Sequence, residues 1–281
     1  LWFYYKAQEH IENRSYVDTT AATQNFVRDT SSFYKAILKR VAEPPALYNQ
    51  EIADETTQSM QYHLNSKGFY DAKVTNEIKK KGKLVTVEYK AITGDLMRIR
   101  QVKYTTTDKN IQPMLSQLEN TSLLKTDAPL ESTAFKKEKN RIVRTLKNKG
   151  FKNFFSNYII YEGDSTNNGT KVEAIILSPS DTSIHQKFYT GQIYVHVQHN
   201  PAQLFNIEYD TVILNGIHFI QKKNEPNFIK KKVLLNAIHI RSGEIYQLDK
   251  LEKTNLKLGQ LGVYKFVSIK SKEVVSDTSD K

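Results

Sequence analysis

One short phrase occurs three times in this sequence and limits what the chain can fold into. Residues 64–69 read Leu-Asn-Ser-Lys-Gly-Phe, residues 146–151 read Leu-Lys-Asn-Lys-Gly-Phe, and residues 258–263 read Leu-Gly-Gln-Leu-Gly-Val. Each copy closes a stretch with helical spacing and runs into residues that favour a strand. We predict that the glycine of each copy ends a helix, because glycine adopts the positive φ of the position after a C-cap without a Cβ penalty.

The distances between the three glycines indicate a repeated small domain. Gly68, Gly150 and Gly262 are 82 and 112 residues apart (150 − 68 and 262 − 150), and three copies in matching context are typical of tandem modules. A chain of 281 residues can hold two or three domains with separate cores. The predicted modules are residues 1–95, 96–183 and 184–281.

The middle module has the clearest pattern. A strand is expected at 97–104, and a first helix follows with Asp108 as its candidate N-cap. A second helix at about 132–149 precedes strands at about 153–162 and 170–178, so the order is β-α-α-β-β. The side chains expected to face the core are Ile111, Met114, Leu115, Leu118, Phe135, Ile142, Val143 and Leu146.

The first module shows the same order without an evident opening strand. Helices are expected at about 22–41 and 51–66, and strands at 69–78 and 84–91. The second strand alternates apolar and polar residues, which is the period of a half-buried strand. The second helix is expected to turn Ile52, Met60 and Leu64 inward.

The last module carries an additional segment. A strand is expected around 193–197, helices at 229–239 and 248–261, and a strand at 263–270. Between the first strand and the helices, residues 205–221 are apolar around Asn215-Gly216, a strong hairpin signal. We interpret this hairpin as an insertion, and the final strand of the module as missing. The predicted fold class is therefore α+β, with tandem modules that each cover a three-stranded sheet with two helices.

Composition excludes several classes of protein. The sequence has no cysteine, so disulfide frameworks, thiolate metal sites and cysteine chemistry are absent. No run of about 18 apolar residues predicts a membrane-spanning helix. The opening residues 1–5, Leu-Trp-Phe-Tyr-Tyr, lack the features of a signal peptide, and we expect the sequence to begin inside a longer chain. The net charge of +11 favours acidic partners, although the lysines are scattered on predicted outer faces and a soluble lysine-rich surface explains them better.

The residues do not indicate an enzyme, a cofactor or a metal. Nucleotide-binding glycine loops, zinc-protease motifs and nucleophile elbows are absent. His196 and His199 are three apart in a predicted strand, so their side chains point to opposite faces and cannot chelate one ion.

Several phrases, taken in order, resemble the POTRA (polypeptide-transport-associated) domains of the BamA/TamA family of outer-membrane β-barrel assembly proteins. The phrases are Glu-Pro-Pro-Ala-Leu at 43–47, Glu-Lys-Asn-Arg-Ile at 138–142, Ser-Gly-Glu-Ile-Tyr at 242–246 and the three glycine phrases. They look most similar to TamL, the lipoprotein branch of Bacteroidetes. The chain departs from that pattern at Ala42, where a glycine is common, at Lys139, where arginine is common, and at Val263, where an aromatic residue is common.

The resemblance implies a non-enzymatic periplasmic arm attached to the outer membrane. Such an arm would bind nascent outer-membrane or surface proteins by β-strand addition. It would be linked to a membrane β-barrel in the same chain, and a TamL-like member would have a TamB-like periplasm-spanning partner. A BamA-like member with other partners is the alternative within the family.

The resemblance also places the candidate binding sites on the strand after each second helix, at 69–78, 152–162 and 263–270. An exposed sheet edge offers unpaired N–H and C=O groups to an incoming strand. An edge blunted by lysines or docked against the next module is an equally good interpretation. The candidate binding residues are Tyr70, Ala72, Val74, Phe155, Tyr158, Ile160, Tyr264, Phe266 and Ser268.

A different class of function remains open. A basic α+β module with interleaved aromatic residues can bind nucleic acid. Its footprint here would be Tyr158, Tyr161 and the lysine cluster at 79–83. The resemblance makes nucleic acid the less expected partner.

Overall fold

The structure is a computed structural model of the whole chain that describes residues 48–166, 169–197, 208–223 and 229–274. The fold is α+β, as predicted from the sequence. Two compact units are present: residues 48–61 with 73–92, and residues 62–72 with 93–274. None of the helices in the described part has the length and apolar character needed to cross a membrane. The predicted helix at 22–41 lies outside the described residues.

The first unit contains a helix and a hairpin. Helix α3 (Gln50–Ser66) begins in this unit, and strands β1 (Lys73–Lys81) and β2 (Leu84–Ile92) form an antiparallel two-stranded sheet. The predicted strand at 69–78 begins four residues later than expected. Residues 69–72 instead form a turn, in which Ala72 N donates to Phe69 O at 3.3 Å.

The inward face of α3 differs from the prediction. Ile52 and Met60 are exposed, whereas Ala53 is buried. The reason is a polar contact with β1: the side-chain amide of Asn76 donates to Thr57 Oγ1 at 2.9 Å and approaches Ala53 O at 3.4 Å. A small residue and a threonine, one turn apart, therefore face the hairpin.

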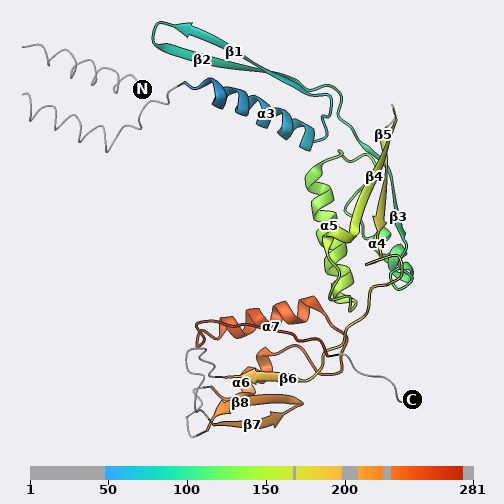
Figure 1. Cartoon of the computed structure of the whole chain (residues 1–281), viewed down its shortest axis with the longest axis vertical. Helices are drawn as coiled ribbons and strands as arrows, with labels where there is room; N and C mark the ends of the chain where they lie inside the picture. The colour runs from blue at the N-terminus through green and yellow to red at the C-terminus, as the bar shows by residue number, and fades with distance from the viewer. Residues whose placement is uncertain (1–47, 167–168, 198–207, 224–228, 275–281) are drawn as a thin grey trace, which may run out of the picture. The chain divides into compact units, whose positions relative to one another are not determined.

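The central part of the second unit has the predicted β-α-α-β-β order (Figure 1). Its elements are β3 (Ile99–Thr106), a short 3-10 helix η1 (Gln112–Met114) that leads into α4 (Leu115–Asn120), α5 (Ser132–Asn148), a second 3-10 turn η2 (Ser156–Tyr158), β4 (Ile159–Thr166) and β5 (Gly169–Ile176). The sheet order is β3-β5-β4, with β3 parallel and β4 antiparallel to β5.

One apolar core joins the two helices to one face of this sheet. Every second residue of β5 is buried, which is the period of a strand with one covered face. The buried members are Tyr104, Ile111, Leu118, Ile142, Leu146, Phe151, Phe154, Ile159, Ala174 and Ile176. The predicted inward residues of α4 and α5 all belong to the core clusters or pack against them.

The strand predicted at 153–162 begins later, at Ile159. Phe151 and Phe154 are fully buried, and they fill the core from the loop between α5 and β4. Their apolar character, which imitates a strand in the sequence, comes from this packing.

Residues 185–188 are held against the central sheet by a buried carboxylate. Asp108 Oδ2 accepts the backbone N–H of His185 at 2.7 Å and lies 2.8 Å from its Nδ1. Asn110 N donates to Asp108 Oδ1 at 2.8 Å, and the Asn110 side chain donates to His185 O at 2.8 Å. Asp108, predicted as a helix N-cap, therefore binds the turn before η1 and also anchors the following segment.

The last part of the chain contains a three-stranded sheet and two helices. Its sheet is β6 (Ile193–His196), β7 (Tyr209–Leu214) and β8 (Ile217–Lys222) in the order β6-β8-β7, and helices α6 (Lys231–Ala237) and α7 (Leu248–Gln260) follow. The hairpin around Asn215-Gly216 forms as predicted, with φ of 49° and 73°. The hairpin lies between the first strand and the two helices, where the middle module has none, and its strand β8 lies beside β6 as β5 lies beside β3.

The strand predicted at 263–270 does not form. The hairpin supplies two of the three strands of this sheet, β7 and β8, and residues 263–274 contain no helix or strand. Tyr264 packs against the core of β6, β8, α6 and α7, whereas Phe266 is 82% exposed.

Candidate strand-binding edge

The nine candidate residues fall into very different environments. Ala72 and Val74 are buried, and the N–H of Val74 is directed at Gln61 Oε1 at 3.4 Å. Tyr70 lies in the turn before β1, where its hydroxyl donates to Leu130 O at 3.1 Å. This group therefore packs against its own surroundings and offers little free backbone.

The second group lies around the start of β4. Phe155 is exposed and lies just before η2, with the ammonium of Lys147 4.5 Å from its ring centroid. Tyr158 lies in η2, with its ring edge-on to His185. Only Ile160 lies in the strand itself, where its side chain is 42% exposed on the face away from the helices.

The third group, Tyr264, Phe266 and Ser268, lies in the segment without a strand. It has no sheet edge to offer.

The central sheet has an open edge along β4, because β5 is the only strand that pairs with β4 in the described part of the chain. Leu177 N donates to Tyr158 O at 2.8 Å, which fixes the phase of the antiparallel ladder. Bonded pairs alternate with non-bonded pairs in such a ladder. Ile160, Glu162 and Asp164 therefore direct their backbone groups at β5.

The alternate residues of β4 direct their N–H and C=O groups at the open edge. These residues are Ile159, Tyr161, Gly163 and Ser165. Sequence reasoning named Ile160, whose backbone groups are directed at β5. The ladder register identifies the outward-directed set, and the sequence does not contain that register.

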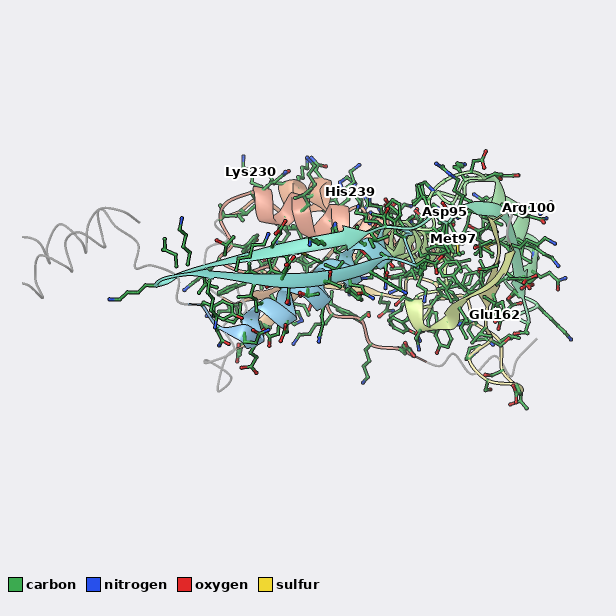
Figure 2. The ribbon with its side chains drawn as sticks, turned by 90° about the horizontal axis from the view of Figure 1, so that it is seen from above. Asp95, Met97, Arg100, Glu162, Lys230 and His239 are labelled. Carbon is green, nitrogen blue, oxygen red and sulfur yellow. The ribbon has the colours of Figure 1, made fainter. Side chains whose placement is uncertain are left out.

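The two faces of β4 differ in character. Tyr161 packs edge-on against Phe135 of α5, with ring centroids 4.9 Å apart, and Ile159 is fully buried. On the opposite face, Glu162 and Asp164 line a shallow depression of about 340 Å³ (Glu162 is labelled in Figure 2). An incoming strand would thus contact aromatic and aliphatic groups on one face and charged groups on the other.

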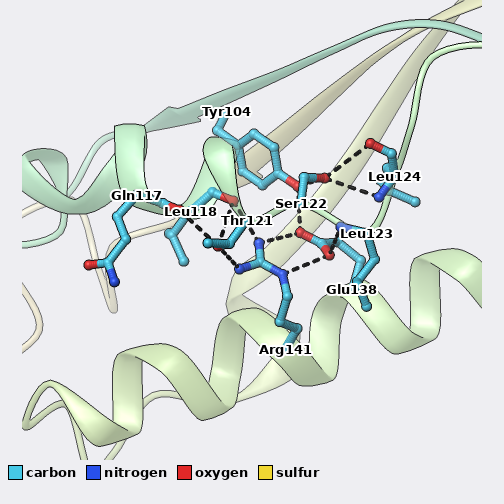
Figure 3. A network of polar contacts seen from close by, with 9 residues as sticks. All are labelled: Tyr104, Gln117, Leu118, Thr121, Ser122, Leu123, Leu124, Glu138 and Arg141. Atoms are coloured by element: carbon cyan, nitrogen blue, oxygen red, sulfur yellow. Dashed lines mark hydrogen bonds and ion pairs between the residues drawn. The ribbon is translucent and has the colours of Figure 1, made fainter.

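A buried polar network under α5 holds the sheet and the helix pair together (Figure 3). Glu138 is fully buried, and its carboxylate accepts hydrogen bonds from the Tyr104 hydroxyl, the Leu123 N–H at 2.9 Å and Arg141 Nε at 2.9 Å. Arg141 also donates to Leu118 O at 2.7 Å. The network joins β3, the end of α4, the following loop and α5.

The ionisation of this network follows from its contacts. Burial of the Glu138 carboxyl opposes its ionisation, but hydrogen bonds from Arg141, Tyr104 and Leu123 outweigh that effect and hold its pKa below the ordinary value. Burial, together with the hydrogen bond to Glu138, raises the pKa of Tyr104. Glu138 and Arg141 belong to the sequence phrase at 138–142, so the structure gives this phrase a role in packing.

A metal site and the nucleic-acid footprint both lack support among the described residues. Among the residues that the structure describes, no group of three or more His, Asp or Glu side chains could hold a metal ion. The proposed nucleic-acid footprint is also poorly placed, because Tyr161 is packed under α5 and Lys79 is paired with Glu88. Stacking platforms for bases need exposed rings.

Comparisons with known proteins give a consistent set of neighbours. No protein-family model and no curated protein matches the chain. The structure is similar to BamA POTRA3-5 of Haemophilus influenzae, with 11% identity, 83% of this chain and 82% of that chain covered, and a TM-score of 0.42. It is similar to POTRA1-2 of the periplasmic domain of Omp85 from Anabaena, with 14% identity, 64% and 91% covered, and a TM-score of 0.32. BamA of Haemophilus ducreyi lacking POTRA domains 1-3 matches 55% of this chain with 27% of its own, at 17% identity and a TM-score of 0.32.

Proposed function

We propose that this chain is a periplasmic arm of tandem POTRA domains from an outer-membrane assembly factor. The proposed domain boundaries lie near 1–95, 96–183 and 184–281. The arm would bind extended segments of unfolded outer-membrane or surface proteins. The observation that carries the proposal is the open edge of β4, with the backbone groups of Ile159, Tyr161, Gly163 and Ser165 directed outward. Strand addition uses backbone hydrogen bonds, so one edge accepts many sequences.

The physical setting of β4 suits this role. The strand is held by β5 on one side and by the core under α5 on one face, so the acceptor edge is rigid before a ligand arrives. A preformed edge reduces the entropy that binding would otherwise cost. No reaction is needed for this work, and the proposed protein is not an enzyme and needs no cofactor.

The wider assignment follows from the sequence phrases and the β-α-α-β-β order. The arm would be attached to the outer membrane by a β-barrel in the same polypeptide. A TamL-like lipoprotein with a TamB-like partner is the finer proposal, and a BamA-like member is its alternative. Detection of a lipid-modified N-terminal cysteine in the mature natural protein supports the former.

The edge itself can be tested by removing one outward donor. Ser165→Pro deletes an outward N–H and leaves the ladder with β5 intact, because proline is tolerated on the solvent side of an edge strand. The neighbouring Asp164→Ala changes a side chain without changing an outward backbone group. Affinity is measured by fluorescence anisotropy with a labelled peptide of alternating apolar and polar residues.

We expect Ser165→Pro to weaken binding about fivefold, the equivalent of one hydrogen bond of about 1 kcal/mol, and Asp164→Ala to leave binding within about twofold. Equal affinities for wild type and Ser165→Pro contradict strand addition at β4. A loss of affinity in both variants points to side-chain recognition instead. The nucleic-acid alternative is favoured if the chain binds single-stranded DNA more tightly than the peptide and if that affinity falls steeply as the salt concentration rises.

A further inference from the structure

Helix α5 carries positive charge along its length and offers no exposed carboxylate. Its only carboxylate, Glu138, is fully buried against Arg141. The cations of the helix are Lys136, Lys137, Lys139, Arg141, Arg144 and Lys147. A surface of one sign attracts partners of the opposite sign and repels partners of its own sign.

The two arginines of this helix are already paired with carboxylates. Arg141 binds Glu138. Arg144 binds Asp249 at 2.6 Å and Glu252 at 2.7 Å, both in α7. Residues three positions apart lie on one face of a helix. The contact with α7 therefore shows that α5 binds carboxylates presented side by side on a regular element.

Lys139 and Lys147 have no carboxylate partner among the described residues. The ammonium of Lys139 lies 5.6 Å from the ring centroid of Tyr161. The ammonium of Lys147 lies 4.5 Å from the ring centroid of Phe155. Both lysine side chains are half-buried. An ammonium carries three N–H donors, so contact with a ring leaves it able to donate to a carboxylate.

Both lysines lie on the flank of α5 that borders β4 (Figure 1). Tyr161 is one of the residues whose backbone groups are directed at the open edge, and its ring packs against Phe135 of α5. Phe155 lies just before η2, which leads into β4. An extended segment that pairs with β4 and continues past its first residue therefore passes both ammonium groups.

The spacing of the two lysines matches the repeat of a strand. They are eight residues apart on α5 (147 − 139), which is about 12 Å along the helix axis. Side chains four residues apart on a strand lie on the same face and about 13 Å apart. Two acidic side chains at this separation on a bound strand would therefore meet one ammonium each.

The opposite face of the central sheet has no preference for one sign of charge. Its depression is lined by the carboxylates of Glu162, Asp164 and Glu173 and by the ammonium groups of Lys103 and Lys171. Charges of both signs favour neither sign in the side chains that a bound strand turns to this face. Discrimination by charge is therefore expected only for the side chains that face α5.

We propose that Lys139 and Lys147 select, at the β4 edge, extended segments with two acidic side chains four residues apart on the face toward α5. The inference rests on the proposed function, because it names the class of segment that the β4 edge binds. The net charge of +11 adds long-range attraction for such segments. The two ammonium groups also fix the register, because a shift by one residue turns both carboxylates to the other face.

The test measures the fluorescence anisotropy of labelled peptides with the 281-residue chain. The acidic peptide has glutamate at two positions four apart, with an apolar residue midway between them. The shifted peptide has the same composition, but its glutamates are three apart and thus on opposite faces of a strand. In the neutral peptide both glutamates are replaced by glutamine.

The decisive variant is Lys139→Gln/Lys147→Gln, and the matched control is Lys109→Gln/Lys137→Gln. The control removes the same net charge from two exposed lysines. Lys137 does not share a face with Lys139, because residues two apart on a helix point in different directions.

We expect the acidic peptide to bind about tenfold more tightly than the neutral and the shifted peptides, because each partly exposed ion pair contributes about threefold. Lys139→Gln/Lys147→Gln should remove this preference, whereas the control variant should keep it. In about 1 M salt, where the Debye length is about 3 Å, the preference should shrink. Lys139→Glu/Lys147→Glu should invert it toward a peptide with lysine at the two positions, a gain that loss of folded protein does not produce.

Equal affinities for the acidic and the shifted peptides overturn the proposal, since they indicate general attraction to a basic surface. A preference that survives Lys139→Gln/Lys147→Gln overturns it as well. Acidic-peptide affinity that Ser165→Pro leaves undiminished places the peptide away from the β4 edge and also overturns it. If the three peptides bind equally and Ser165→Pro weakens all of them, only this inference fails. If no peptide binds, the proposed function fails with it.

Discussion

Replacing Glu138 by glutamine should destabilise the central module strongly. The substitution keeps the volume but leaves the Arg141 guanidinium beside a neutral amide, and it weakens the acceptor for the Tyr104 hydroxyl and the Leu123 N–H. Breaking one side of a buried ion pair costs about 3–5 kcal/mol. The Arg141 side chain is 16% exposed and can regain some hydration, so we expect the free energy of unfolding to fall by about 3 kcal/mol.

The assay is urea unfolding followed by circular dichroism. With an m value of about 2 kcal/mol per M, a loss of about 3 kcal/mol lowers the midpoint by about 1.5 M. The matched control is Glu119→Gln on α4, an exposed carboxylate, for which the change should stay within about 0.5 kcal/mol.

Acid provides a second measurement of the same network. The pKa of Glu138 is held below its ordinary value in the folded state, so its contribution to stability is complete above the unfolded pKa of about 4.3 and is lost as pH falls toward the folded pKa. The stability difference between wild type and Glu138→Gln should therefore shrink below about pH 4. A loss under about 1 kcal/mol at neutral pH, or a difference that does not change on acidification, refutes the reasoning.

Two further substitutions test contacts between distant segments of the chain. Gly150→Ala should lower the free energy of unfolding, measured by thermal unfolding, by about 2–4 kcal/mol, because positive φ and a side chain 2.8 Å away both oppose a Cβ. Gly82→Ala, with open space around its Cβ position, should lower it by only about 1–2 kcal/mol, and similar losses in both variants would show that the close approach at Gly150 is unimportant. Asp108→Ala should lower the free energy of unfolding by about 2–3 kcal/mol and accelerate hydrogen exchange at His185 N, because a buried donor loses its acceptor. Asp164→Ala, on the exposed sheet face, should change neither the free energy of unfolding nor the exchange rate.

The apolar periodicity was sufficient for the helices and for part of the sheet. The predicted second helices at 132–149 and 248–261 agree with α5 and α7 within one residue at each end. The Asn215-Gly216 hairpin was also predictable, since few residues other than these adopt two successive positive φ angles. The division into three modules and the binding residues remain predictions.

The errors occur where a local pattern has two structural explanations. Phe154 is apolar because it fills a core, although it reads as part of a strand. Ile52 reads as an inward residue of α3, but Asn76 on β1 selects the face that carries Thr57. In both cases the deciding partner is distant in sequence.

The sequence by itself determined where helices end, because a glycine with positive φ acts within one turn of its own backbone. It also determined the alternation that makes β5 a strand with one covered face. Only the tertiary structure decided which strand fills each sheet position, which backbone groups of β4 face outward, and why Glu138 is buried. Strand order, ladder phase and burial of a charge depend on contacts between residues far apart in the chain, and no local pattern encodes them.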